Sequence, residues 1–308
     1  MSLPRSIDLI EVGPRDGLQN ERKIIPTSVK IELVNRLSKA GFREIEVSSF
    51  VSPKWVPQLA DAAEVFAGID RHEGVTYSAL VPNEQGLERA LAFGVDKIAV
   101  FLAASETFSQ RNTNGTIAEV LTRTQPVVRA AREAGLPVRG YISCVVACPF
   151  EGPIEPLEVR SVAESLLEMG VTEIDLGETI GVAVPRDMDQ LYSALNGLLK
   201  PADTTLHLHD TRGTALVCAH HAMQMGVTRF DASCGGLGGC PYAPGAAGNL
   251  ATEDLIYYGR RMGIETGVDL DAVLTATQVV ASSCSRSLTG RMFVAERGAL
   301  SGDSSCAS

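Results

Sequence analysis

Long apolar runs are missing from this 308-residue chain, and none approaches the roughly 20 apolar residues that a membrane helix requires. The first residues lead directly into a strand-like run at 7–13, without an apolar signal segment or an Arg- and Ser-rich leader. Hydrophobic residues make up 45% of the chain and charged residues 21%, the composition of a globular protein with a sizeable core. We therefore expect a cytoplasmic protein with no membrane partner.

Positive charge is also scarce. The chain has 27 Lys and Arg residues against 37 Asp and Glu residues, a formal net charge of −10. Basic residues form no cluster larger than pairs such as Arg22–Lys23, whereas a nucleic-acid-binding protein normally presents a basic patch. Nucleic acid is therefore not an expected partner, and an anionic ligand would have to be held by local groups against the field of the whole chain.

The seven cysteines form no CxxC motif, which leaves a zinc ribbon or a thioredoxin-like site without support. Their number is odd and their spacing irregular, so we expect reduced thiols that are mostly small core residues. Cys240 differs from the others, because it stands in the glycine-rich run GGLGGCPYAPGAAGN (235–249), which has little capacity to bury it. Cys306, in the C-terminal GDSSCAS, is interpreted as incidental.

The phosphate-binding signatures of common nucleotide-binding folds are absent, since no GxGxxG follows the first strand-like run and no Walker A lysine motif occurs. The sequence instead alternates short Val- and Ile-rich runs with longer amphipathic ones, which indicates a parallel sheet covered by helices. Eight such pairs favour a closed (β/α)8 TIM barrel over an open sheet. The expected strands are 7–13, 44–50, 75–81, 96–104, 138–146, 171–179, 204–210 and 228–234.

The amphipathic runs between these strands predict the covering helices, several of which end in a glycine that would supply a left-handed cap. One more helix is expected at 269–285, followed by a Gly- and Ser-rich end. We therefore predict a single catalytic domain over 1–290 and a short mobile tail over 291–308. The covering helices are expected at 27–41, near 61–68, and at 83–94, 117–135, 156–170, 185–199, 213–226 and 252–263.

Polar side chains interrupt the hydrophobic pattern where the predicted strands end, and a TIM barrel carries its chemistry at the C-terminal ends of its strands. In LHLHD, His207 and His209 are two residues apart and point to the same face of one strand. An isolated pair of this kind is about equally compatible with core histidines bonded to backbone carbonyls. Here Asp16 and Glu46 should converge on the same mouth, so we interpret the pair as part of a divalent-metal site. The nitrogen and oxygen ligands favour Mg²⁺ or Mn²⁺, with Zn²⁺ or Co²⁺ as alternatives.

Several motifs together closely resemble the 3-hydroxy-3-methylglutaryl-CoA lyase family of metal-dependent TIM-barrel lyases. The similarity runs from about Ile10 to Thr289. The motifs are EVGPRDGLQNE (11–21), SFVSPKWVPQ (49–58), RGYISC (139–144), LGETIG (176–181), HLHDTRG (207–213) and GGLGGCPYAPGAAGNLATED (235–254).

This resemblance implies a carbon–carbon lyase that cleaves 3-hydroxy-3-methylglutaryl-CoA to acetyl-CoA and acetoacetate, as in leucine degradation. It implies an acyl-CoA substrate, a homodimer, and a metal held by Asp16, His207, His209 and Asn249. Glu46 would orient these ligands or a metal-bound water. The acceptor of the hydroxyl proton stays open among Asp16, His207 and a metal-bound water.

The resemblance also implies roles around the metal. Arg15 would stabilise the thioester oxygen, Cys240 would be the general acid on a closing loop, and Glu253 would support that loop. The catalytic set is thus Cys240, Arg15, Asp16, His207 and Glu46. The expected substrate-binding residues are Arg15, Gln19, Ser49, Tyr141, Glu178 and Thr179.

Two residues depart from the best-known lyases, which carry aspartate in place of Glu178 and tyrosine in place of Arg212. Both changes lie near the mouth and could alter which acyl chain is accepted. A lyase for citramalyl-CoA or a longer 3-hydroxyacyl-CoA is therefore an alternative. A Claisen-condensing synthase and a catalytically inactive scaffold are the less favoured alternatives.

Overall fold

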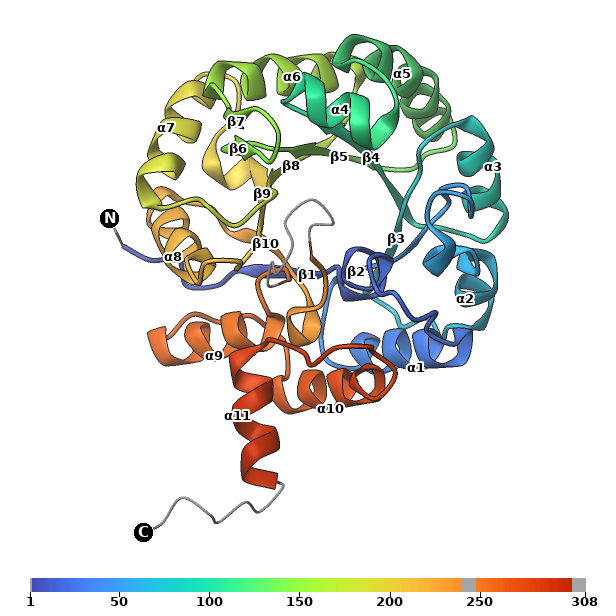
Figure 1. The fold of residues 1–308 in the computed structure, drawn as a ribbon, viewed down its shortest axis with the longest axis vertical. Coiled ribbons are helices and arrows are strands. Elements are labelled where there is room, and N and C mark those ends of the chain that lie inside the picture. The colour runs from blue at the N-terminus through green and yellow to red at the C-terminus, as the bar shows by residue number, and fades with distance from the viewer. Residues whose placement is uncertain (1, 240–247, 301–308) are drawn as a thin grey trace.

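The computed structural model describes residues 2–239 and 248–300, with side chains described as far as residue 296. Eight parallel strands close into a barrel in the order β1-β10-β9-β8-β5-β4-β3-β2, and Figure 1 shows the helices arranged around this ring. The predicted TIM barrel is confirmed. The barrel strands are β1 (Asp8–Glu11), β2 (Glu44–Ser49), β3 (Thr76–Leu80), β4 (Lys97–Ala103), β5 (Val138–Ser143), β8 (Glu173–Glu178), β9 (Thr204–Leu208) and β10 (Arg229–Ala232).

The predicted helices are present, and each lies within or close to its expected range. None of the described helices combines the length and the apolar composition needed to span a bilayer. They are α1 (Thr27–Ser38), α2 (Ala62–Gly68), α3 (Glu84–Ala92), α5 (Ile117–Glu133), α6 (Pro156–Met169), α7 (Pro185–Leu195), α8 (Ala215–Met225), α9 (Thr252–Met262) and α10 (Leu270–Ala281).

Among the short elements that were not predicted, three follow the strands β1, β4 and β5. The segment after β1 forms a single π-helical turn, η1 (Gly13–Gly17). A short helix, α4 (Glu106–Thr113), follows β4, and a two-stranded hairpin of β6 (Ala147–Cys148) and β7 (Gly152–Pro153) follows β5. All three lengthen loops of the barrel, and loop elaboration leaves the hydrophobic periodicity of the strands unchanged.

The tail was predicted to begin at residue 291, but the structure has a helix there, α11 (Arg291–Leu300). The carboxylate of Asp254 on α9 accepts the backbone N–H groups of Arg291 and Met292 at 3.0 and 2.7 Å, which satisfies two donors at the start of the helix. Phe293 is buried in the main hydrophobic core. These long-range contacts fix the segment, and the Gly- and Ser-rich composition on either side hid them. Residues 301–308 lie outside the described part of the chain.

A network of charged side chains fills the N-terminal end of the barrel. Lys97 pairs with Glu44 at 2.7 Å, and Arg139 pairs with Glu44 at 3.1 Å and with Glu173 at 3.3 Å. Each of these residues is the first or second of its strand. Buried charges are tolerated when they are paired. This network of paired charges therefore closes the N-terminal end of the barrel, and the candidate site residues lie at the other end.

Glu11, the last residue of β1, is fully buried, and its side chain joins three segments of the chain. Its Oε1 accepts the backbone N–H groups of Gly13 and Cys234 at 2.8 and 2.9 Å, and its Oε2 accepts the hydroxyl of Thr252 at 2.7 Å. The carboxylate thereby ties the turn after β1 to the segment after β10 and to the start of α9. Burial raises the pKa of Glu11 to about 7, although the hydrogen bonds from Cys234, Thr252 and Gly13 lower it.

This raised pKa predicts a pH-dependent stability. The folded chain keeps the Glu11 proton up to about pH 7, whereas the unfolded chain releases it near 4.5, so the folded state binds more protons in this window. The free energy of unfolding should therefore fall by about 3 kcal/mol from this group as pH rises from 4.5 to above 7. Denaturant unfolding at pH 5 and pH 8 should show this loss relative to Glu11→Gln. An identical pH dependence in both proteins would contradict it.

Candidate active site

The C-terminal end of the barrel brings together side chains from three distant parts of the sequence. Asp16 lies in η1, directly after β1, and His207 lies near the end of β9. Asn249 comes from the segment before α9, which runs back antiparallel to the end of β9 through a bridge between His209 and Asn249. The barrel topology therefore places residues 16, 207, 209 and 249 at one mouth, as the sequence predicted.

Asp16, His207 and His209 form a group that could hold a metal ion, with ligand atoms that all lie within 4.8 Å of one another. Asn249 adjoins it, because its Oδ1 is 3.1 Å from His207 Nε2 and its Nδ2 donates to Asp16 Oδ2 at 2.8 Å. The Nδ1 atom of His209 is buried and finds no hydrogen-bond partner among the described residues. Two imidazoles, a carboxylate and an amide oxygen suit a divalent cation.

Asp231, in the middle of β10, was not among the predicted site residues, yet it contacts His207 from the other side. Its Oδ2 is 3.0 Å from His207 Nδ1, while Arg139 donates to its Oδ1 at 3.2 Å. Although burial raises the pKa of Asp231, Arg139 and the bond to His207 bring it below its ordinary value. The only available signal was an aspartate inside the apolar strand run TRFDASC. Carboxylates of this kind orient metal-binding imidazoles.

Asp175, His207 and Asp231 make a second group with metal-compatible spacing. The guanidinium of Arg139 lies 3.7 Å from Asp175 and 3.2 Å from Asp231, so a cation there would face a fixed positive charge. Burial and the neighbouring Asp231 carboxylate raise the pKa of Asp175 well above its ordinary value. This second group therefore belongs to the support of His207 and not to a separate cation site.

The two histidines have opposite electrostatic surroundings. Burial lowers the pKa of His207, but the bond to Asp231 and the charge of Asp16 outweigh it and raise this pKa to about 9. Burial and the charge on His207 lower the pKa of His209 to about 4. For Asp16, burial acts upward, and the charges of Arg15 and His207 bring its pKa to about 2. Asp16 and His209 are thus already in the deprotonated forms that a metal requires.

Arg15 is fixed beside this group by two carboxylates and one ring. Its Nε donates to Glu46 Oε2 and its Nη1 to Asp16 Oδ1, both at 2.6 Å. The hydroxyl of Tyr141 also donates to Glu46 Oε2 at 3.1 Å, and the guanidinium lies 5.2 Å from the centre of the Tyr141 ring. Burial raises the pKa of Glu46, although the charge of Arg15 lowers it. Glu46 therefore positions Arg15 from β2.

Of the remaining predicted substrate-binding residues, some contact the metal candidates and others bind the backbone. Gln19 belongs to the cluster, because its Nε2 donates to Asp16 Oδ1 at 2.8 Å. Ser49 donates its hydroxyl to the carbonyl of Leu80 at 3.3 Å and accepts the N–H of Val51 at 3.2 Å, so it shapes the loop after β2. Cys240 lies outside the described residues, and its role stays a prediction.

Glu178 and Thr179, at the end of β8, both bind backbone. Glu178 lies on the same face of the strand as Leu176, which belongs to the main hydrophobic core. The Oε1 atom of Glu178 accepts the N–H of Val182 at 3.1 Å. The hydroxyl of Thr179 accepts the N–H of Cys144 at 2.8 Å, a residue with φ of 63°. The structure therefore gives both residues a part in holding the mouth loops.

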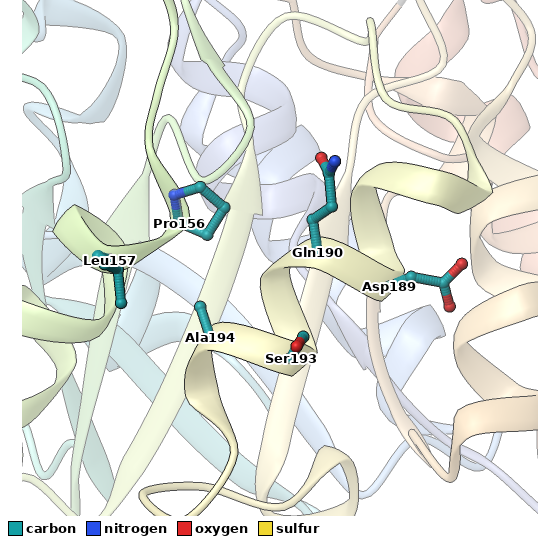
Figure 2. Close-up of a pocket in the computed structure, with 6 residues that line it drawn as sticks. All are labelled: Pro156, Leu157, Asp189, Gln190, Ser193 and Ala194. Carbon is teal, nitrogen blue, oxygen red and sulfur yellow. The ribbon is translucent and has the colours of Figure 1, made fainter.

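An open groove on the outer surface lies away from this mouth. Figure 2 shows it between the start of α6 and the helix α7. None of the residues that approach His207 lines it. Its lining residues are Pro156, Leu157, Asp189, Gln190, Ser193 and Ala194.

Comparison with known proteins connects this mouth to an enzyme family. The model of the HMGL-like family matches residues 6–280. The chain belongs to the HMGL-like family. It is 48% identical over 94% of its length to a mitochondrial hydroxymethylglutaryl-CoA lyase of Macaca fascicularis, of which 90% is covered. It is also 48% identical to a cytoplasmic 3-hydroxy-3-methylglutaryl-CoA lyase of Rattus norvegicus, and the match covers 94% of this chain and 84% of the relative. The names of these relatives thus place some in mitochondria and others in the cytoplasm.

Solved structures agree with this family. A hydroxymethylglutaryl-CoA lyase from Pseudomonas aeruginosa superimposes with a TM-score of 0.94 at 48% identity, over 97% of this chain and 100% of the other. An HMG-CoA lyase from Acinetobacter baumannii, solved with coenzyme A and 3-methylmalate, has a TM-score of 0.90 at 37% identity, over 100% of this chain and 99% of the other. The HMGL-like barrel is therefore shared along nearly the whole chain.

The bond between Asp231 and His207 predicts the effect of Asp231→Asn. The amide keeps the shape of the side chain but loses the charge that fixes the imidazole, so Mn²⁺ affinity should fall about 10- to 100-fold in calorimetric titration. Asp189→Asn is the matched control, because Asp189 contacts His221 Nε2 at 2.8 Å at the surface. Equal Mn²⁺ affinity in the two variants would contradict the role given to Asp231.

Proposed function

We propose that this chain is a hydroxymethylglutaryl-CoA lyase, which cleaves 3-hydroxy-3-methylglutaryl-CoA to acetyl-CoA and acetoacetate. The observation that carries the proposal is the convergence of Asp16, His207, His209 and Asn249 beside Arg15 at the barrel mouth. It occurs in a chain that is 48% identical to enzymes of this name over 94% of its length. An acyl-CoA is therefore the proposed ligand.

Mg²⁺ or Mn²⁺ is the proposed cofactor, and Asp16, His207, His209 and Asn249 are its proposed ligands. When bound, such an ion supplies Lewis-acid stabilisation to oxygens of the substrate and a template that orients them. The ligand atoms of Asp16, His207 and His209 lie within 4.8 Å of one another, a spacing that one cation can bridge. The contact of Asp231 with His207 Nδ1 directs Nε2 toward Asp16 and Asn249.

Arg15 is the proposed stabiliser of negative charge on the thioester oxygen. Its attraction to Glu46 and Asp16 outweighs burial and raises its pKa, so the guanidinium stays charged. Glu46 occupies Nε and Asp16 occupies Nη1. Nη2 has no hydrogen bond within the described residues, and it is the nitrogen we assign to the substrate. A preorganised donor of this kind is commonly worth several kcal/mol in the transition state.

The reaction requires two proton movements around one carbon–carbon bond. The C3 hydroxyl loses a proton as the bond breaks, and the bonding electrons leave with the acetyl-CoA carbon, which then takes up a proton. Cys240 is the proposed donor of that second proton. Cys240 and the proposed ligand Asn249 both belong to the glycine-rich run 235–249.

The two departures from the best-known lyases give little support to a different substrate. Arg212 donates from Nη1 to the carbonyls of Ile180 and Gly181 at 2.9 and 3.1 Å. Glu178 accepts the N–H of Val182 in the same loop. Both residues therefore hold the loop between β8 and α7, and a substrate contact would require them to give up these bonds.

A substrate comparison tests the proposed function. With Mg²⁺ or Mn²⁺, 3-hydroxy-3-methylglutaryl-CoA should release acetyl-CoA faster than citramalyl-CoA or longer 3-hydroxyacyl-CoA esters do, and EDTA should abolish the reaction. Acetyl-CoA with a 2-oxo acid should release no free thiol. Thiol release in that second assay, without cleavage in the first, would indicate a condensing enzyme instead.

The role of Cys240 is tested by Cys240→Ser. The serine hydroxyl is a much weaker acid than the thiol, so turnover should fall by orders of magnitude while Mn²⁺ affinity stays unchanged. Cys218→Ser is a suitable control, because this thiol lies on the covering helix α8 and donates to the carbonyl of Ala183 at 3.3 Å. Unchanged turnover of Cys240→Ser would refute the acid role.

We also propose a homodimer on the basis of the family resemblance, which sedimentation analysis would test. The cytoplasmic location stays a prediction, since relatives are named for both compartments.

A further inference from the structure

Arg286 lies in the segment after α10, far in sequence from the metal candidates, yet it contacts the glycine-rich segment directly. Its Nη2 donates to the carbonyl of Gly238, and its Nε donates to Glu21 Oε1 at 3.0 Å. The Glu21 side chain is only 3% exposed, so the carboxylate holds the guanidinium from the interior. One planar fork thus joins the end of the EVGPRDGLQNE motif to the glycine-rich segment.

Gly238 packs against Asn249 without space for a side chain. A Cβ atom at Gly238 would lie 2.8 Å from Asn249 Nδ2, and Gly238 has φ of +112°, which L side chains rarely adopt. The position of the Gly238 backbone therefore limits where the Asn249 amide can lie. That amide in turn donates to Asp16 Oδ2 and contacts His207 Nε2.

We propose that Arg286 is a positioning residue of the metal site, which acts through Gly238 on the amide of Asn249. The inference rests on the proposed function only in that Asn249 is taken as a metal ligand. Arg286 lies 32 residues after Asp254, the end of the last motif that carries a predicted ligand, and the family resemblance implied no role for it.

Neighbouring contacts act in the same direction. The backbone N–H groups of Thr289 and Gly290 both donate to the carbonyl of Gly235, at 3.1 and 3.0 Å. Asn20 Nδ2 donates to the carbonyl of Gly239 at 2.6 Å. Glycines have wide conformational freedom, so their carbonyls must be held from outside if the adjoining amide is to keep one place. Arg286 supplies the charged member of these bonds, and charge-assisted bonds are the stronger ones.

Mn²⁺ binding to Arg286→Ala tests the proposal, measured by calorimetry or by the EPR signal of free Mn²⁺. Affinity should fall about 10- to 100-fold, as for other groups that orient metal ligands. The kcat for 3-hydroxy-3-methylglutaryl-CoA should fall with it, while KM at saturating Mn²⁺ changes little. Arg286→Lys, which keeps a charged donor, should recover part of the affinity. Gly238→Ala should reproduce the loss, because it displaces the same amide.

Arg160→Ala is the matched control. Arg160 also pairs with a glutamate, Glu164 at 2.8 Å, and donates to two carbonyls, those of Ala194 and Asn196, but it lies on the outer helices. Its metal-free melting temperature should fall at least as much as that of Arg286→Ala, with Mn²⁺ affinity unchanged. Wild-type Mn²⁺ affinity in Arg286→Ala, or an equal loss in Arg160→Ala, would overturn the positioning role. Mn²⁺ binding without cleavage of the acyl-CoA would overturn the proposed function alone.

Discussion

The contact between His207 and Asp231 is the constraint on which the rest of the barrel interior depends. A buried carboxylate beside an imidazole is stable only if its other oxygen is also satisfied, and Arg139 supplies that partner at 3.2 Å. Arg139 is itself paired with Glu44 and Glu173 at the N-terminal end of the strands. The charged network that closes the barrel and the imidazole at its mouth are therefore parts of one column of paired charges.

This column explains how the barrel carries so many buried ionisable groups. Tyr141 bridges its upper part, since its hydroxyl lies 3.1 Å from Glu46 and 3.3 Å from Asp231. Removing one partner would leave its neighbour as an uncompensated buried charge, which costs several kcal/mol. The stability of the barrel and the geometry of the proposed site are thus linked, because Arg15 and His207 are held by members of the same network.

The sequence allowed the strands, most helices and the convergence of residues 16, 207 and 209 to be predicted, because these follow from local periodicity and from the order of strands in a barrel. It did not reveal Asp231 or Arg286, since neither stands in a recognisable motif. Their roles come from contacts between residues that are distant in the sequence. Asp231 and His207 are 24 residues apart, and Arg286 and Gly238 are 48 residues apart. The direction of Glu178 was available from strand alternation, because Asp175 and Glu178 are an odd number of residues apart and face opposite sides.

Charge at the mouth also constrains the order of binding. Asp16, Glu46 and Asp231 bring three carboxylates to the cluster, against the two guanidinium groups of Arg15 and Arg139. The chain as a whole carries a net charge of −10. An acyl-CoA with its own carboxylate and phosphates would therefore approach an unfavourable field. His207, whose pKa is raised to about 9, adds a third positive charge, so these groups balance before a cation binds. A divalent cation that binds Asp16 and displaces the His207 proton would leave one net positive charge. The ion that would orient the substrate would then also attract the anionic end of the substrate. Metal binding should therefore precede productive substrate binding.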